Sequence, residues 1–198
     1  GNLAFTIFEA IYAHVVNSVS LLGDAGHNLS DVLGLLLAWG AAYLATKKSS
    51  KLFSYGYRRT TILATIINSI VLVIAAGYIA AESLERFFTP SPVAEVAIMF
   101  VASVGIVVNA GTALLFSKGS HHDLNLRGAF LHLAYDAVIS AGVVVGAIVM
   151  YLTGWLWVDP LIGLMIVFVI VGGTWTLLRD SINLILDAVP QNINRQHV

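Results

Sequence analysis

One pattern of residues that can bind a metal ion occurs twice in this sequence. His27 is followed at position i+4 by Asp31, and His132 is followed by Asp136 at the same spacing. Residues i and i+4 lie on the same face of an α-helix, so each pair would present an imidazole and a carboxylate together. In a chain of 198 residues with six histidines, two such pairs are not expected by chance.

The chemistry of these four side chains indicates a zinc-type site. Two imidazole nitrogens and two carboxylate oxygens suit tetrahedral Zn²⁺, whereas Mg²⁺, Ca²⁺ and Mn²⁺ prefer oxygen shells or higher coordination numbers. Cd²⁺ and Co²⁺ accept the same ligands. The chain has no cysteine, which excludes thiolate metal sites and disulfides. The predicted metal ligands are therefore His27, Asp31, His132 and Asp136.

The charge of this ligand set predicts how the site can exist inside a membrane. Two carboxylates repel each other and are costly to desolvate, whereas one divalent cation brings their total charge to zero. When the cation leaves, protons on His or Asp must neutralise the site, and histidine titrates near neutrality. A site that holds either a metal ion or protons is a proton-coupled exchanger, provided that it opens to each side in turn.

The elements that must position these residues are membrane helices. The chain is 58% hydrophobic and 11% charged, whereas soluble domains are about 45–50% apolar and about 25% charged. Its net charge of −1 gives no indication of nucleic-acid binding. Apolar runs of about 20 residues cross a bilayer as helices. We predict an all-α membrane protein with a six-transmembrane-helix bundle, its spans being 3–20, 19–46, 59–88, 94–117, 128–153 and 159–187.

The distribution of basic residues predicts the orientation of the bundle. Six spans place both termini on one side of the membrane, together with the loops around residues 47–59 and 118–127. That side holds nine of the ten Lys and Arg residues, and the other side holds only Arg86. By the positive-inside rule, both termini are cytoplasmic. Asp159 is predicted to be the N-cap of the last span, with Pro160 as its first helical residue.

The spans 19–46 and 128–153 are antiparallel, which predicts how the two pairs would meet. His27 would face Asp136, and Asp31 would face His132. From these bounds, His132 lies closer to the cytoplasm than Asp31 does. The two levels match if the span 19–46 continues into the cytoplasm, or if the later span begins near residue 124.

Other ionisable residues are open to more than one interpretation. Asp24, three residues before His27, could be a fifth ligand, but we favour a partner that orients His27 or a helix-start cap. A single His–Asp pair could also be a structural hydrogen bond between helices. Glu9 is a helix contact or an accessory polar group, and His14 is expected in polar packing. A solvated loop is the favoured interpretation of 121–123, which contains His121 and His122.

The segments "SVSLLGDAGHNLSDVLGLLLAW", "FSYGYRRTTILATIIN", "LNLRGAFLHLAYDAVISAGVVVGAI" and "WVDPLIGLMI" resemble the cation diffusion facilitator family of metal transporters. The resemblance covers all six predicted spans. It implies that His27, Asp31, His132 and Asp136 form the transport site, and the two-histidine form is the one associated with zinc. It also implies proton-driven zinc efflux, a homodimer, and a bundle of the first, second, fourth and fifth spans beside a pair of the third and sixth.

The resemblance also predicts the domain organisation. Residues 1–190 form the six-span transport domain, and 191–198 begin a linker to a cytoplasmic C-terminal domain that this sequence does not include. Both ends of the sequence look trimmed. The segment "SYGYRRTT" has no histidine, so no second metal site is expected there. We expect an integral, multi-pass protein of the inner (cell) membrane of a bacterium rather than of an organelle membrane.

Three competing functions follow from the same residues. The first is a Zn²⁺/H⁺ antiporter, with Zn²⁺ as substrate and protons as counter-ion. The second is an intramembrane metalloenzyme, which needs an open coordination position and motifs such as His-Glu-x-x-His that are not present; we do not expect an enzyme. The third is a metal-binding channel or sensor without proton coupling.

Overall fold

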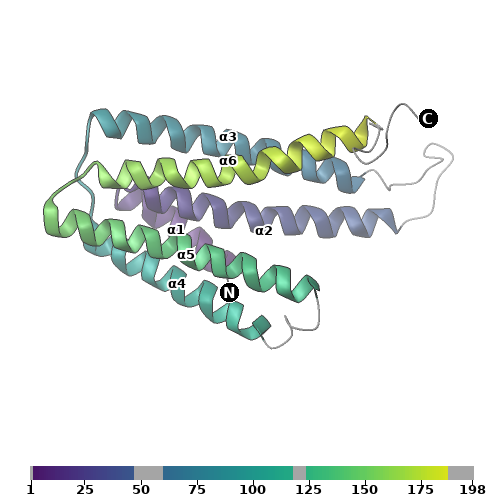
Figure 1. Ribbon diagram of the computed structural model, residues 1–198, viewed down its shortest axis with the longest axis horizontal. Helices are drawn as coiled ribbons and strands as arrows, with labels where there is room; N and C mark the ends of the chain where they lie inside the picture. Colours follow the sequence, from purple (N-terminus) through teal and green to yellow (C-terminus); the bar gives the residue numbers. More distant parts are fainter. Residues whose placement is uncertain (1, 47–59, 118–123, 187–198) are drawn as a thin grey trace, which may run out of the picture.

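The structure is a computed structural model and describes residues 2–46, 60–117 and 124–186. Within these ranges the fold is all-helical and has no strand. Six helices follow one another along the described chain (Figure 1). They are α1 Asn2–Val15, α2 Val19–Ala45, α3 Thr60–Phe88, α4 Glu95–Ser117, α5 Leu124–Thr153 and α6 Val158–Ile185.

Four helices in the described ranges, α3, α4, α5 and α6, are long and apolar enough to cross a membrane. α1, with 14 residues, and α2, which carries Asp24, His27 and Asp31 within its length, are not among these four. Large apolar side chains such as Leu115 and Phe168 are exposed on the helices, as is expected of a surface that faces lipid. The chain is an integral membrane protein, while six crossings and cytoplasmic termini remain predictions.

Two predicted helix bounds are wrong. The first span does not continue to residue 20, because α1 ends at Val15 and Asn17 has a φ of 58°, a left-handed conformation that cannot continue a helix. The fifth span begins at Leu124 and not at residue 128. Hydropathy marks where apolar residues begin, whereas the backbone helix extends four residues further, through the polar Asn125 and Arg127.

The prediction that Asp159 caps its own helix is also wrong. α6 begins at Val158, two residues before the predicted first residue, so Pro160 is its third residue. The buried Asp159 carboxylate accepts hydrogen bonds from the backbone N–H groups of Val19 and Ser20, at 2.8 and 3.2 Å. The hydroxyls of Ser18 and Ser20 also donate to it, at 2.6 and 2.5 Å. Because the first N–H groups of a helix have no partner within it, Asp159 stabilises the start of α2 instead.

Further contacts hold together the end of the bundle that contains the connections 16–18, 89–94 and 154–157, called the turn end below. Arg86 donates to Glu82 Oε1 at 2.9 and 2.7 Å, an i, i+4 pair within α3. The same guanidinium donates to the carbonyl oxygen of Asn17. The N–H of Ala94 donates to the carbonyl oxygen of Val16 at 3.3 Å. These bonds join α3 and its connection to α4 with the α1–α2 turn.

The helices pack as a ring of four with a pair beside it. α1 contacts α2 and α4, α4 runs along α5, and α5 contacts α2, which closes the ring. α3 runs along α6, and both contact α2 on its other side. This arrangement agrees with the one that the family resemblance implies. Figure 1 shows α4 and α5 running away from α3 and α6 toward the end of the bundle opposite the turn end, called the far end below.

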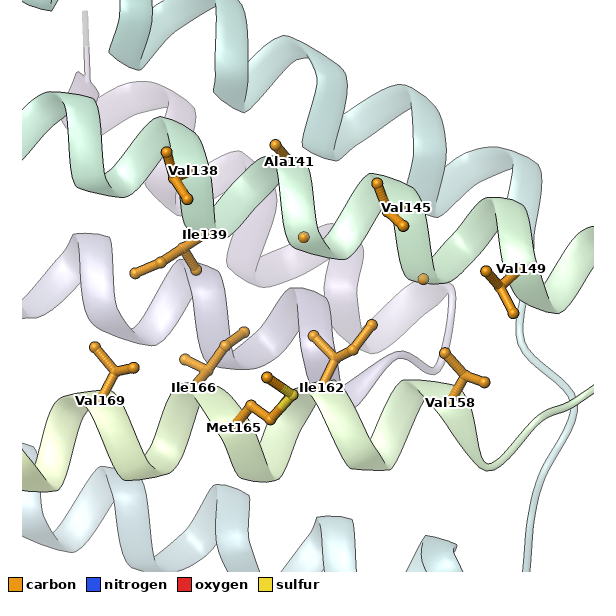
Figure 2. Close-up of a pocket in the computed structure, with 12 residues that line it drawn as sticks. Val138, Ile139, Ala141, Val145, Val149, Val158, Ile162, Met165, Ile166 and Val169 are labelled. Carbon is orange, nitrogen blue, oxygen red and sulfur yellow. The ribbon is translucent and has the colours of Figure 1, made fainter.

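An apolar cavity of about 580 Å³ lies between α5 and α6. Ile139 of α5 and Ile162 and Ile166 of α6 extend into the space between the two helices (Figure 2). All twelve residues that line it are Val, Ile, Ala, Gly or Met. Such a lining offers no nitrogen or oxygen side-chain ligand to a metal ion, so the polar chemistry must be located elsewhere.

Candidate metal centre

The two His-x-x-x-Asp pairs lie on α2 and α5, which contact each other. Across the helices, His27 Nε2 lies 3.4 Å from Asp136 Oδ1, and His132 Nε2 lies 3.3 Å from Asp31 Oδ2. Within each helix, His27 Nε2 lies 3.7 Å from Asp31 Oδ2, and His132 Nε2 lies 3.8 Å from Asp136 Oδ2. The structure therefore brings all four predicted ligands together.

These distances can be compared with the dimensions of a zinc site. Zn–N and Zn–O bonds of about 2.0–2.2 Å place the ligand atoms of a tetrahedral site about 3.4 Å apart. The two cross-helix distances of 3.3 and 3.4 Å are close to that value. One ligand atom from each of His27, Asp31 and Asp136 lies within 4.8 Å of the others. The rings of His27 and His132 have centroids 6.3 Å apart in a T-shaped arrangement, so the two imidazoles approach the same volume without stacking.

The hydrogen bonding of the two carboxylates is incomplete. Asp31 Oδ2 and Asp136 Oδ1 are buried and have no hydrogen-bond partner in the described part of the chain. A buried carboxylate oxygen without a donor is costly. A divalent cation, or protons on the neighbouring imidazoles, would supply the missing positive charge.

Access to the four side chains is unequal. The side chain of Asp136 is only 4% exposed, whereas that of His132 is 48% exposed. On α5, His132 lies one turn closer to the far end than Asp136 does. The centre is therefore accessible mainly at its far-end edge and buried toward the turn end.

The start of α5 at Leu124 bears on whether His132 and Asp31 lie at the same depth in the bundle. Because the helix begins there, His132 lies more than two turns inside it. His132 then reaches the level of Asp31, as their 3.3 Å separation shows. α5 begins earlier, as one alternative required, and α2 continues 14 residues beyond Asp31 to Ala45, against 8 residues between Leu124 and His132, so the helix bounds fit both alternatives that the sequence left open.

Asp24 is not a helix-start cap, because the N-cap of α2 is Ser18, whose side chain accepts the Leu21 N–H. Asp24 is fully buried in the second turn of α2. It accepts hydrogen bonds from the Ser140 hydroxyl at 2.6 Å and from Asn28 Nδ2 at 3.3 Å. Neither recorded partner is His27, so no hydrogen bond supports the role of orienting that histidine.

Sequence reasoning missed Asn28 and Ser140, which both contact Asp24. Asn28 Nδ2 also lies 3.4 Å from Glu9 Oε2, which extends the hydrogen-bonded chain to α1. Spacing could have indicated both residues, since Asn28 follows Asp24 and Ser140 follows Asp136 at i+4.

The remaining predictions concern His14, the loop that contains His121 and His122, and the segment 191–198. His14 is exposed on α1, so its predicted polar packing is wrong. His121, His122 and the segment 191–198 lie outside the described residues.

Comparison with known proteins identifies a family and a set of similar relatives, among them the three that follow. Residues 1–186 match the cation efflux transmembrane domain. The chain is 36% identical over 192 residues to the "Cadmium, cobalt and zinc/H(+)-K(+) antiporter" of Bacillus subtilis, a match that covers 96% of this chain and 62% of the relative. It is 34% identical over 194 residues to the "Metal cation efflux system protein CzcD" of Cupriavidus metallidurans, covering 98% and 61%. It is 33% identical over 191 residues to the "Zinc transporter ZitB" of Escherichia coli, covering 96% and 61%. The chain thus spans less than two thirds of the length of these relatives.

Proposed function

This chain belongs to the cation diffusion facilitator family, whose members are metal ion transporters and not enzymes, and we propose that it is a proton-coupled zinc antiporter. It would export Zn²⁺ from the cytoplasm by alternating access, with protons moving in the opposite direction. The single metal site would lie between α2 and α5, with His27, Asp31, His132 and Asp136 as its ligands.

The observation that supports this proposal most strongly is the pair of unpaired carboxylate oxygens. Asp31 Oδ2 and Asp136 Oδ1 are buried without a hydrogen-bond partner in the described ranges, and an imidazole nitrogen lies within 3.4 Å of each. Zinc would satisfy both carboxylates and both imidazoles at once.

Charge balance supports the exchange of zinc for protons. With Zn²⁺ bound, the two carboxylates and the cation sum to zero. Without it, the neutral imidazoles leave two negative charges in a membrane protein, where unpaired charge is expensive. Protons that bind as the metal leaves would keep the centre near neutrality through both halves of the cycle.

The unequal exposure supports a direction of access. The centre is exposed through His132, on the edge that faces the far end, and the Lys and Arg distribution predicts that this end is cytoplasmic. Zinc would then enter from the cytoplasm in the described conformation. Release to the other side would require α5 and its partner α4 to move relative to α2 near the turn end.

The ligand set also accepts Cd²⁺ and Co²⁺, and the Bacillus subtilis relative is named for cadmium, cobalt and zinc. We therefore propose Cd²⁺ and Co²⁺ as further substrates. We also propose that the protein assembles as a homodimer, as the family resemblance implies. The alternative function is a metal-binding channel or sensor without proton coupling. In a channel, zinc flux would not depend on a pH gradient, and in a sensor there would be no flux.

Transport into proteoliposomes tests the proposal. Vesicles with an acidic lumen and an enclosed zinc-sensitive dye should take up zinc faster than vesicles without a pH gradient. Asp31→Ala and Asp136→Ala should each remove this uptake, while Asp180→Ala, which changes an exposed aspartate of α6, should retain it. Gradient-driven uptake that persists in both ligand variants would contradict the proposed site. Uptake by the unaltered protein that ignores the gradient would favour the channel.

A further inference from the structure

A second buried polar cluster lies next to the candidate metal centre and contains none of its ligands. It joins Glu9 of α1, Asn28 and Asp24 of α2, and Ser140 of α5. Asn28 Nδ2 lies 3.4 Å from Glu9 Oε2 and 3.3 Å from Asp24 Oδ1, and the Ser140 hydroxyl donates to Asp24 Oδ2 at 2.6 Å. Glu9, Asp24 and Ser140 are all 0% exposed. Two carboxylates thus share one amide group in the interior of the protein.

The hydrogen-bond donors of this cluster are too few for two carboxylate ions. Glu9 Oε1 is buried and has no hydrogen-bond partner among the described residues. An oxygen that is fully buried and unpaired indicates a missing proton or cation, because leaving it as part of a free anion is costly.

The helices around the cluster offer no fixed positive charge close to it. Within their bounds, α1, α2, α4 and α5 contain one Lys or Arg, the exposed Arg127, which lies about 20 Å along α5 from Ser140. The titratable groups that interact with Asp24 are His27 of α2 and Asp136 of α5, and the one that interacts with Glu9 is Asp24 itself. α4 contributes only Glu95 at its first residue, and α1 otherwise carries Tyr12 and the exposed His14.

The geometry favours a proton over a metal ion as the missing positive charge. The Asn28 amide occupies the position between the two carboxylates, within 3.4 Å of both. A sodium or potassium ion bridging them would have to displace that side chain, whereas a proton on one carboxyl oxygen needs no additional space.

The cluster lies on the turn-end side of the metal centre. Along α2, Asp24 is about one turn closer to the turn end than His27, and along α5, Ser140 is one turn closer than Asp136. A proton that enters from the turn end would therefore reach the cluster before it reaches the metal ligands. The exposed edge of the centre, at His132, lies on the opposite side.

We infer that Glu9 and Asp24 share one proton and form a proton-holding pair, separate from the metal ligands, through which protons pass between the turn end and the metal centre. The inference rests on the proposed antiport for its role in transport. The presence of the shared proton does not depend on transport and can be measured separately.

Infrared spectroscopy of the zinc-loaded protein at pH 7 tests the shared proton. An exposed glutamate titrates near pH 4.3 and an aspartate near 3.9, so a protonated carboxyl band at pH 7 must come from a special site. We expect one such band, lost in Glu9→Gln or Asp24→Asn and retained in Glu85→Gln, which changes an exposed glutamate of α3. Absence of the band, or a band unchanged in both variants, would overturn the inference.

Two transport assays on the same variants test the role of the pair. In Glu9→Gln, uptake driven by a pH gradient should fall at least tenfold, while exchange of isotopic zinc at equal pH, which moves no net protons, should stay within threefold. An equal loss of uptake and of isotope exchange would show that the pair is structural and would overturn its role in proton transfer. Uptake that requires potassium or sodium, and loses this requirement in Glu9→Gln, would instead assign the pair to a monovalent cation. If the unaltered protein ignores the gradient but keeps the band, the proposed antiport fails and the proton assignment stands.

Discussion

Two buried carboxylate sites in this protein differ in how their oxygens are satisfied. The Asp159 carboxylate accepts four hydrogen bonds from Ser18, Val19 and Ser20, all from neutral donors within a single turn of chain. Asp31 and Asp136 each keep one buried oxygen without a hydrogen-bond partner in the described ranges. Both sites are found at contacts of α2, one with α6 and the other with α5. α2 thus contacts one satisfied anion, Asp159 of α6, and contributes ligands to one centre that still requires positive charge.

The comparison indicates what separates a structural carboxylate from a cation-binding one. Hydrogen bonds from backbone N–H groups and hydroxyls satisfy the Asp159 carboxylate within the fold, so that it fixes the start of α2. The ligand carboxylates lack such donors, and they can therefore respond to the arrival of a metal ion or a proton. A centre that must bind and release a cation cannot have its charge already compensated.

The largest effect is expected when a ligand carboxylate is neutralised. Asp136→Asn should lower zinc transport by about 100-fold or more, because it removes both a ligand and the charge that balances Zn²⁺. Its thermal stability should not fall, since the change removes a poorly satisfied buried charge. Proteoliposome uptake and a melting curve of the same preparation measure the two quantities. A strong loss of stability would show that Asp136 is structural, as Asp159 is.

Asp159→Ala should give the opposite result. Four donors at the start of α2 would lose their acceptor, and each buried donor left without a partner costs about 1–3 kcal/mol. Thermal or denaturant unfolding should therefore show a large loss of stability. Zinc affinity of the fraction that remains folded should stay within about threefold, because none of the metal ligands is changed. Unaltered stability would contradict the structural role of this carboxylate.

Replacing one type of metal ligand by another should have a smaller effect than removing a ligand charge. His27→Asp replaces an imidazole by a third carboxylate, and oxygen donors favour Mn²⁺ relative to Zn²⁺. We expect the preference for zinc over manganese to fall by about tenfold, as measured by competition binding. Asn109→Asp, which changes a buried asparagine of α4, should leave the preference unchanged. An unchanged ratio in His27→Asp would exclude His27 from the ligand shell.

The smallest effect is expected for the ion pair at the turn end. Glu82→Ala removes the partner of Arg86, but both side chains are partly exposed and such pairs contribute about 0–1 kcal/mol. Zinc transport should be unchanged, and the midpoint of unfolding should shift by only a few degrees. A loss of stability as large as that of Asp159→Ala would mean that the Arg86 bond to the Asn17 carbonyl depends on Glu82.

The chemistry of the chain was easier to predict from sequence than its helix ends. The i, i+4 spacing of His27 with Asp31 and of His132 with Asp136 is local, so each pair could be placed on one helix face without the fold. The long apolar runs likewise indicated the helices α3 to α6. Where α5 begins depends on backbone hydrogen bonds through polar residues, which hydropathy does not register.

The role of Asp159 could not be predicted, because its partners are about 140 positions away in the sequence. The sequence Asp-Pro favours a helix start, and that local signal was misleading: the carboxylate serves the start of α2 and not that of α6. For the same reason the cluster of Glu9, Asp24 and Ser140 was not apparent, since it combines residues from three helices. Contacts between distant segments are what the structure adds.

A single centre that binds either zinc or protons can be detected by calorimetric zinc titration. Titrations between pH 5.5 and 7.5, in buffers of different protonation enthalpy, give the zinc affinity and the number of protons released. Because the imidazoles must lose their protons to bind metal, we expect one zinc per chain, release of about one to two protons at the acidic end, and weaker binding as the pH falls. Zinc binding without proton release, or binding that is unaltered in Asp31→Ala and Asp136→Ala, would contradict the account.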